Sequence, residues 1–121
     1  MLSGLIGLNK RIFAYRRKRI LNYEKLFRDF INKLIAEFGE KISIVLFGSR
    51  GRGDNRESSD YDLLIVLKES EDRDRLQILK LKPLSVPIDI IVVNPSELSN
   101  PVLKKMLRQS RVLYDGLKCF S

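Results

Sequence analysis

The sequence predicts a single α/β domain, in the broad α+β sense of a mixed β-sheet with helices packed on it. Three short, strongly apolar segments have the composition of buried strands, at residues 41–47, 61–67 and 88–93. Stretches with helical periodicity lie before, between and after them. A length of 121 residues is typical of one domain, and a hydrophobic fraction of 44% is enough to build one core.

Residues 9–38 have the pattern of an amphipathic helix, because apolar side chains recur there at three- and four-residue steps. The basic cluster at residues 16–19 interrupts this stripe and favours a break near Asn22. Gly39 is a favourable helix stop. We therefore expect residues 1–39 to form a basic helical extension that packs on a core made by residues 40–121.

The strands and their connections follow in order. Lys41 to Phe47 is β-branched and apolar, as expected of a strand covered on both faces. Residues 50–59 are polar and glycine-rich, which predicts a loop or a short helical turn. Residues 61–67 and 88–93 are the second and third strands, and residues 69–81 between them form a short charged helix.

The C-terminal part predicts one more helix and an edge strand. Residues 94–97 have the composition of a turn that leads into a helix, with Ser96 as its cap. The helix spans residues 98–108 and is interrupted or begun again at Pro101. Residues 111–114 add a short edge strand before the turn at residues 115–116.

Composition excludes several kinds of chemistry. The chain has no histidine and one cysteine, Cys119, which removes Ser/His/Asp and Cys/His catalysis, an internal disulfide and a cysteine-based zinc site. No apolar run approaches the length of a bilayer, and basic residues follow the apolar start instead of preceding it, unlike a secretory signal. We expect a cytoplasmic protein without a membrane segment.

The net charge of +8 is spread unevenly. Residues 1–40 hold nine Lys and Arg against four acids, residues 41–94 nine against nine, and residues 95–121 five against two. Basic flanks favour an acidic partner, such as nucleic acid or a phosphate-rich substrate. The alternative is a solvated helix face, which is the commoner explanation of a short basic cluster.

Paired acids form the most informative pattern. Asp60 and Asp62 open the second strand, and residues two apart in a strand share a face. Two close carboxylates repel one another and are costly to bury without a counter-charge, which a Mg²⁺ ion with oxygen ligands provides. Asp89, in the third strand, is a third acid that could bind metal and accept a proton from an attacking hydroxyl.

A Gly48-Ser49 turn closes the first strand. Glycine lets backbone amides approach a phosphate, and the serine hydroxyl adds a donor. Arg50 and Arg52 are further candidates for holding phosphate, although they could equally pair with acids of the following loop. The chain has no Gly-Lys-Ser/Thr and therefore no Walker A loop.

Together these motifs resemble those of the nucleotidyltransferase superfamily that includes DNA polymerase β. Gly48-Ser49, ten residues, Asp60-Tyr61-Asp62 and then a strand Asp at 89 have its order and spacing. The form Gly-Ser-Arg-x-Arg-Gly-x₅-Ser-Asp-x-Asp-Leu and the short length are similar to minimal nucleotidyltransferases, the MNT family. The resemblance covers about residues 40–93 and implies a palm-like nucleotidyltransferase domain over residues 40–121. Relatives commonly carry alanine at position 51, where Gly51 is expected to loosen the turn.

The resemblance implies that a nucleoside monophosphate passes from an NTP, with ATP expected, to an acceptor hydroxyl. It implies a two-metal Mg²⁺ site on Asp60, Asp62 and Asp89, and a triphosphate-holding turn at Gly48 and Ser49. Minimal members are often antitoxins encoded beside a HEPN-type toxin, and some add AMP to a tyrosine of that partner. A HEPN-type toxin is therefore the implied acceptor and partner.

Two other functions fit the same residues. The chain could be a binding module that masks its toxin without turnover, or a nucleic-acid-binding protein that grips phosphates through its basic flanks. The sequence leaves open the base preference and whether the chain forms homo- or hetero-oligomers.

Overall fold

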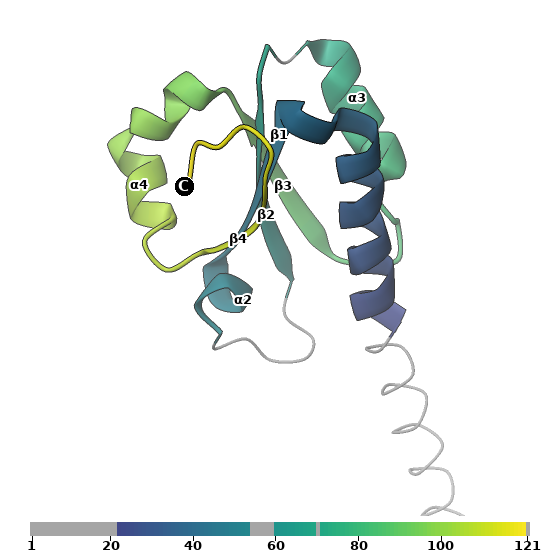
Figure 1. Cartoon of the computed structure of the whole chain (residues 1–121). Coiled ribbons are helices and arrows are strands. Elements are labelled where there is room, and N and C mark those ends of the chain that lie inside the picture. Colours follow the sequence, from purple (N-terminus) through teal and green to yellow (C-terminus); the bar gives the residue numbers. More distant parts are fainter. Residues whose placement is uncertain (1–21, 54–59, 70, 121) are drawn as a thin grey trace, which may run out of the picture.

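The computed structural model describes residues 22–53, 60–69 and 71–120 of the chain. It contains one four-stranded sheet in the order β3-β2-β1-β4. β1 pairs antiparallel with β2 and with β4, whereas β2 and β3 are parallel. This mixed sheet with helices confirms the predicted fold class (Figure 1). The strands are β1 (Ile42–Phe47), β2 (Tyr61–Leu67), β3 (Ile88–Val93) and β4 (Arg111–Asp115).

One face of the sheet is covered by two helices, the first helix (residues 22–38) and α3 (Asp72–Leu81). Phe30 and Leu34 of the first helix are buried and share one core with Leu63 and Ile65 of β2. The predicted helix is thus confirmed over residues 22–38. The residues before 22, including the basic cluster, lie outside the described part of the chain. A domain boundary after residue 39 stays a prediction, since this helix contributes to the core.

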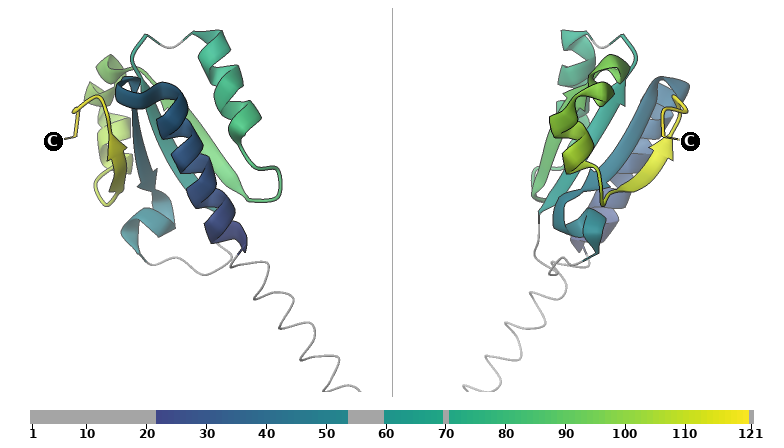
Figure 2. Two further views of the ribbon diagram at one scale, coloured as in Figure 1. Left: turned by 45° about the vertical axis from the view of Figure 1, so that its right-hand side comes forward. Right: turned by 90° about the vertical axis from the view of Figure 1, so that its left-hand side faces the viewer.

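The other face is covered by the C-terminal part of the chain. The short helices η2 (Pro95–Ser99) and α4 (Pro101–Met106) lie on it, opposite the first helix (Figure 2). Leu103 and Phe120 pack there against Leu64 and Val66 of β2. None of the helices in the described ranges has both the length and the apolar character that a membrane crossing requires.

Hydrogen bonds of the caps explain where the C-terminal helices begin. The predicted cap at Ser96 is wrong, because Asn94 caps η2. The Asn94 backbone amide donates a hydrogen bond to the Glu97 carboxylate at 2.9 Å. The interruption predicted at Pro101 is confirmed, because η2 ends at Ser99 and α4 begins at Pro101, although α4 ends at Met106 and not at residue 108. Asn100 follows η2 and accepts a hydrogen bond from the Val102 amide at 2.8 Å, so that α4 starts at Pro101.

The C-terminal segment is fastened to the sheet by Asp115. Its carboxylate accepts hydrogen bonds from the Ser43 hydroxyl at 2.8 Å and from the Cys119 and Phe120 amides at 3.0 and 3.1 Å. Burial by itself would raise the pKa of Asp115, but these hydrogen bonds outweigh it and hold the pKa below its usual value. The network also provides a partner for Ser43, which is fully buried in β1.

Candidate active site

The end of β1 places Gly48 directly against the Asp62 carboxylate. Phe47 is the Cα partner of Asp62, so the chain leaves β1 beside that side chain. Gly48 has a φ of +68°, which L side chains rarely adopt, and a Cβ on it would overlap Oδ2 of Asp62. Glycine is therefore required here both by the backbone and by the space that the carboxylate takes.

A second carboxylate stands next to Asp62 on the neighbouring strand. Asp62 and Asp89 are Cα partners in the parallel pair β2 and β3. Paired residues of adjacent strands share a face, so both side chains project from the same face of the sheet. Asp89 and Asp60 are exposed and Asp62 is partly buried, which leaves the pair accessible to a ligand.

The charge environment of Asp62 reflects these neighbours. Burial raises the pKa of Asp62, and the negative charges of Asp89 and Asp60 raise it further. In the described part of the chain, no three acidic, histidine or cysteine side chains are gathered closely enough to hold a metal ion. The structure thus brings Asp62 and Asp89 into register, while a three-ligand site that includes Asp60 stays a prediction.

The helix α2 (Gly48–Arg52) begins at the predicted Gly48-Ser49 turn, and its Arg50 lies against Tyr61, away from the carboxylates. The Arg50 guanidinium carbon lies 3.8 Å from the centre of the Tyr61 ring, and Phe27 stacks on that ring at 4.1 Å. Two groups so close to one ring must occupy its opposite faces, so Tyr61 forms a layer between α2 and the first helix. The structure does not bring Arg50 together with Asp62 and Asp89, and a phosphate-holding role for Arg50 stays a prediction.

Tyr61 supports the strand that carries Asp62, a role that the sequence interpretation missed. Only 4% of its surface is exposed, and it lies on the face of the sheet opposite to Asp62. The sequence contained a signal for this position, because side chains alternate between the two faces of a strand. A residue between two outward carboxylates must therefore point into the core. The Phe27–Tyr61–Arg50 stack therefore joins the first helix and α2 to the strand that carries Asp62.

The remaining predicted residues lie on α2. Ser49 follows Gly48 in its first turn, and Arg52 ends it beside Lys105 and Arg108 at a shallow pocket of 290 Å³. Gly51 does not simply loosen this turn. A Cβ at Gly51 would meet the Leu46 carbonyl oxygen at 2.5 Å and the Gln109 carbonyl oxygen at 3.2 Å, so the missing side chain lets α2 pack tightly against both segments.

Known proteins with similar sequences have names that refer to nucleotidyl transfer. Residues 27–114 match the family model described as nucleotidyltransferase domain. The chain is 35% identical over 100 residues to a Methanocaldococcus jannaschii protein named "Putative protein adenylyltransferase", covering 72% of this chain and 68% of that protein. A second protein of that organism with the same designation is 38% identical over 102 residues, covering 78% of this chain and all of that one.

Two solved structures have a similar fold. One, titled as a "putative nucleotidyltransferase" of Sulfolobus solfataricus, superposes with a TM-score of 0.55 at 24% identity, covering 78% of this chain and 82% of that chain. The other is a chain of a toxin–antitoxin complex crystallised with AMP-PNP. It superposes with a TM-score of 0.50 at 26% identity, covering 70% of each chain.

Proposed function

This chain belongs to the nucleotidyltransferase domain family, and we propose that it transfers AMP from ATP to a hydroxyl group of a partner protein. The observation that carries the proposal is the contact of Gly48 with Asp62 together with the register of Asp62 and Asp89. A turn without a side chain and two adjacent carboxylates on one sheet face can accommodate phosphates and the cations that neutralise them.

Similar proteins support the donor and the acceptor class. The two Methanocaldococcus jannaschii relatives are named for adenylyl transfer to protein, and AMP-PNP, present in the toxin–antitoxin structure, is an analogue of ATP. We therefore take ATP as the donor and a toxin, of the HEPN type that the motif resemblance implies, as the acceptor. In this interpretation the chain acts as an antitoxin.

Each residue has a defined task in the proposed reaction. Asp62, Asp89 and Asp60 would hold Mg²⁺, which when bound offsets the charge of the phosphates. Gly48 leaves room for the Asp62 carboxylate beside the turn, and Ser49 would donate a hydrogen bond to the triphosphate. The acceptor oxygen bonds to the α-phosphorus, pyrophosphate leaves, and the exposed Asp89 carboxylate takes the hydroxyl proton.

The chemistry is tested by following the label of ATP. The purified chain is incubated with Mg²⁺, the protein encoded beside it in the genome, and ATP labelled at either the α- or the γ-phosphate. We expect label on the partner from α-labelled ATP only, since phosphoryl transfer would use the γ-phosphate. Asp62→Asn should abolish labelling while leaving the circular dichroism spectrum unchanged.

The controls distinguish AMP transfer from masking of the partner without turnover. Undiminished labelling in Asp62→Asn, or label from the γ-position, would exclude the proposed mechanism. If the wild-type chain labels nothing but wild type and Asp62→Asn both neutralise the partner, the chain acts by masking. Exposed Asp29 on the first helix provides the matched variant, Asp29→Asn, which should transfer AMP at the wild-type rate.

A further inference from the structure

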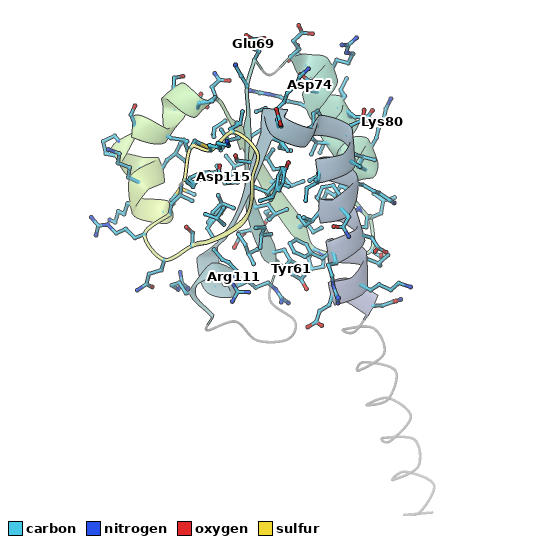
Figure 3. All side chains as sticks on the ribbon, viewed as in Figure 1. Tyr61, Glu69, Asp74, Lys80, Arg111 and Asp115 are labelled. Carbon is cyan, nitrogen blue, oxygen red and sulfur yellow. The ribbon has the colours of Figure 1, made fainter. Side chains whose placement is uncertain are left out.

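A cleft lies on the sheet face opposite to Asp62 and Asp89. It has a volume of 440 Å³ and opens between the first helix, α2 and β4. Each of these elements contributes one arginine, Arg28, Arg50 and Arg111, and Glu24 is the acid among the described lining residues. Figure 3 shows Tyr61 and Arg111 at the same end of the sheet, beside α2.

The floor of the cleft is built from packed side chains. Tyr61 and Leu46 are almost fully buried there, and Phe27 stacks on Tyr61. The Arg50 guanidinium is positioned by its 3.8 Å contact with the Tyr61 ring. At least one of the three cations is therefore held in a defined place, which distinguishes the cleft from a set of solvated surface charges.

Charge balance indicates what the cleft binds. Arginine stays protonated at all physiological pH values, and among the described lining residues Arg28 and Arg111 outnumber the one acid, Glu24. The planar guanidinium fork matches the oxygens of a phosphate group, to which it can donate two parallel hydrogen bonds. A volume of 440 Å³ lies within the range of pockets for small ligands. We propose that this cleft is a second ligand site, which binds a phosphate group through Arg28 and Arg111, beside the Arg50 guanidinium on Tyr61.

This site is independent of the proposed transfer reaction. On the face of Asp62 and Asp89 a phosphate needs a divalent cation, because the carboxylates repel it. The arginine cleft needs none. A ligand in the cleft would touch Arg50, which follows Ser49 in the chain, and would thereby contact the helix that carries the phosphate-holding turn.

The phosphate could belong to a free nucleotide or to a nucleic-acid strand, and calorimetry distinguishes the two. Pyrophosphate, ATP and a short single-stranded oligonucleotide are titrated into the full chain in EDTA, which prevents binding through divalent cations. We expect at least one of these probes to bind with a stoichiometry of one. Binding of pyrophosphate and ATP would identify a small phosphate ligand, and binding of the oligonucleotide alone a nucleic-acid backbone.

Variants that each remove one positive charge show where on the chain the phosphate group binds. Arg28 and Arg111 are exposed, so Arg28→Gln and Arg111→Gln should fold normally and each weaken binding about tenfold or more. Arg75→Gln, at an exposed position of α3 outside the cleft, removes the same charge and should leave the affinity unchanged. Asp62→Asn should also bind normally, which keeps this test separate from the transfer reaction. Absence of binding by all three probes, or an equal loss in Arg75→Gln, would overturn the proposal.

Discussion

Gly48→Ala tests the contact on which the active site is built. The new methyl group would overlap the Asp62 carboxylate and would place an L residue at a φ of +68°. The left-handed backbone costs about 1–2 kcal/mol, and forcing Asp62 off its rotamer costs about 0.5–1.5 kcal/mol more. We expect the free energy of unfolding to fall by about 2–3 kcal/mol. Displacing a reacting group by about 1 Å lowers a rate about a hundredfold, and we expect that loss in AMP transfer.

Gly53→Ala is the matched control. Gly53 also has a positive φ, of +82°, but a Cβ on it would meet no atom within 4 Å. This variant should therefore lose about 1–2 kcal/mol of stability and keep its transfer rate. Urea denaturation measures the first quantity, and labelling of the partner from α-labelled ATP measures the second. If Gly48→Ala transfers AMP as fast as Gly53→Ala, the contact with Asp62 has no part in catalysis.

Three further predictions concern stability and are checked by urea denaturation. Leu34→Ala should lower the free energy of unfolding by about 2–5 kcal/mol, because Leu34 is fully buried; a loss below about 1 kcal/mol would show that the first helix is an addition to the core and no part of it. Asp115→Ala should cost about 1–3 kcal/mol by leaving the Ser43 hydroxyl and two amides without their acceptor, whereas Ser99→Ala, on exposed η2, should cost far less. Ionisation of Asp62 should destabilise the folded chain. Because the pKa of Asp62 is raised in the folded state, the free energy of unfolding is highest below the ordinary carboxyl pKa and falls as the pH rises through the raised pKa. At pH 7 without divalent cations, Asp62→Asn should therefore be more stable than wild type by less than about 1 kcal/mol, and a less stable variant would contradict the proposed repulsion.

Local composition predicted the strands well. The β-branched segments at residues 61–67 and 88–93 have the predicted boundaries, since buried strands leave a continuous apolar signal. The edge strand near residue 111 was predicted as well. The helix expected from Glu69 begins later, at Asp72. Glu69 has a positive φ, and Glu71 caps the helix by exchanging hydrogen bonds with Asp74.

Tertiary pairing could not be read from the sequence in the same way. The motif spacing placed Asp60 and Asp62 on one strand, but only the parallel pairing of β2 with β3 puts Asp89 opposite Asp62 and leaves Asp60 outside that pair. The stacking of Tyr61 between Phe27 and Arg50 likewise joins three elements that are distant in sequence. The helix cap at Asn94 could have been predicted from the sequence, however, because Glu97 follows three residues later, as in a capping box.

The central claim is that Asp62 and Asp89 together bind a divalent cation. Anomalous diffraction from Mn²⁺ tests this claim most directly. Crystals of the chain are grown with Mn²⁺ and a non-hydrolysable ATP analogue. We expect an anomalous peak beside Gly48, within about 2.2 Å of oxygens from both Asp62 and Asp89. A metal peak elsewhere on the chain, or one bound by neither of these carboxylates, would contradict it.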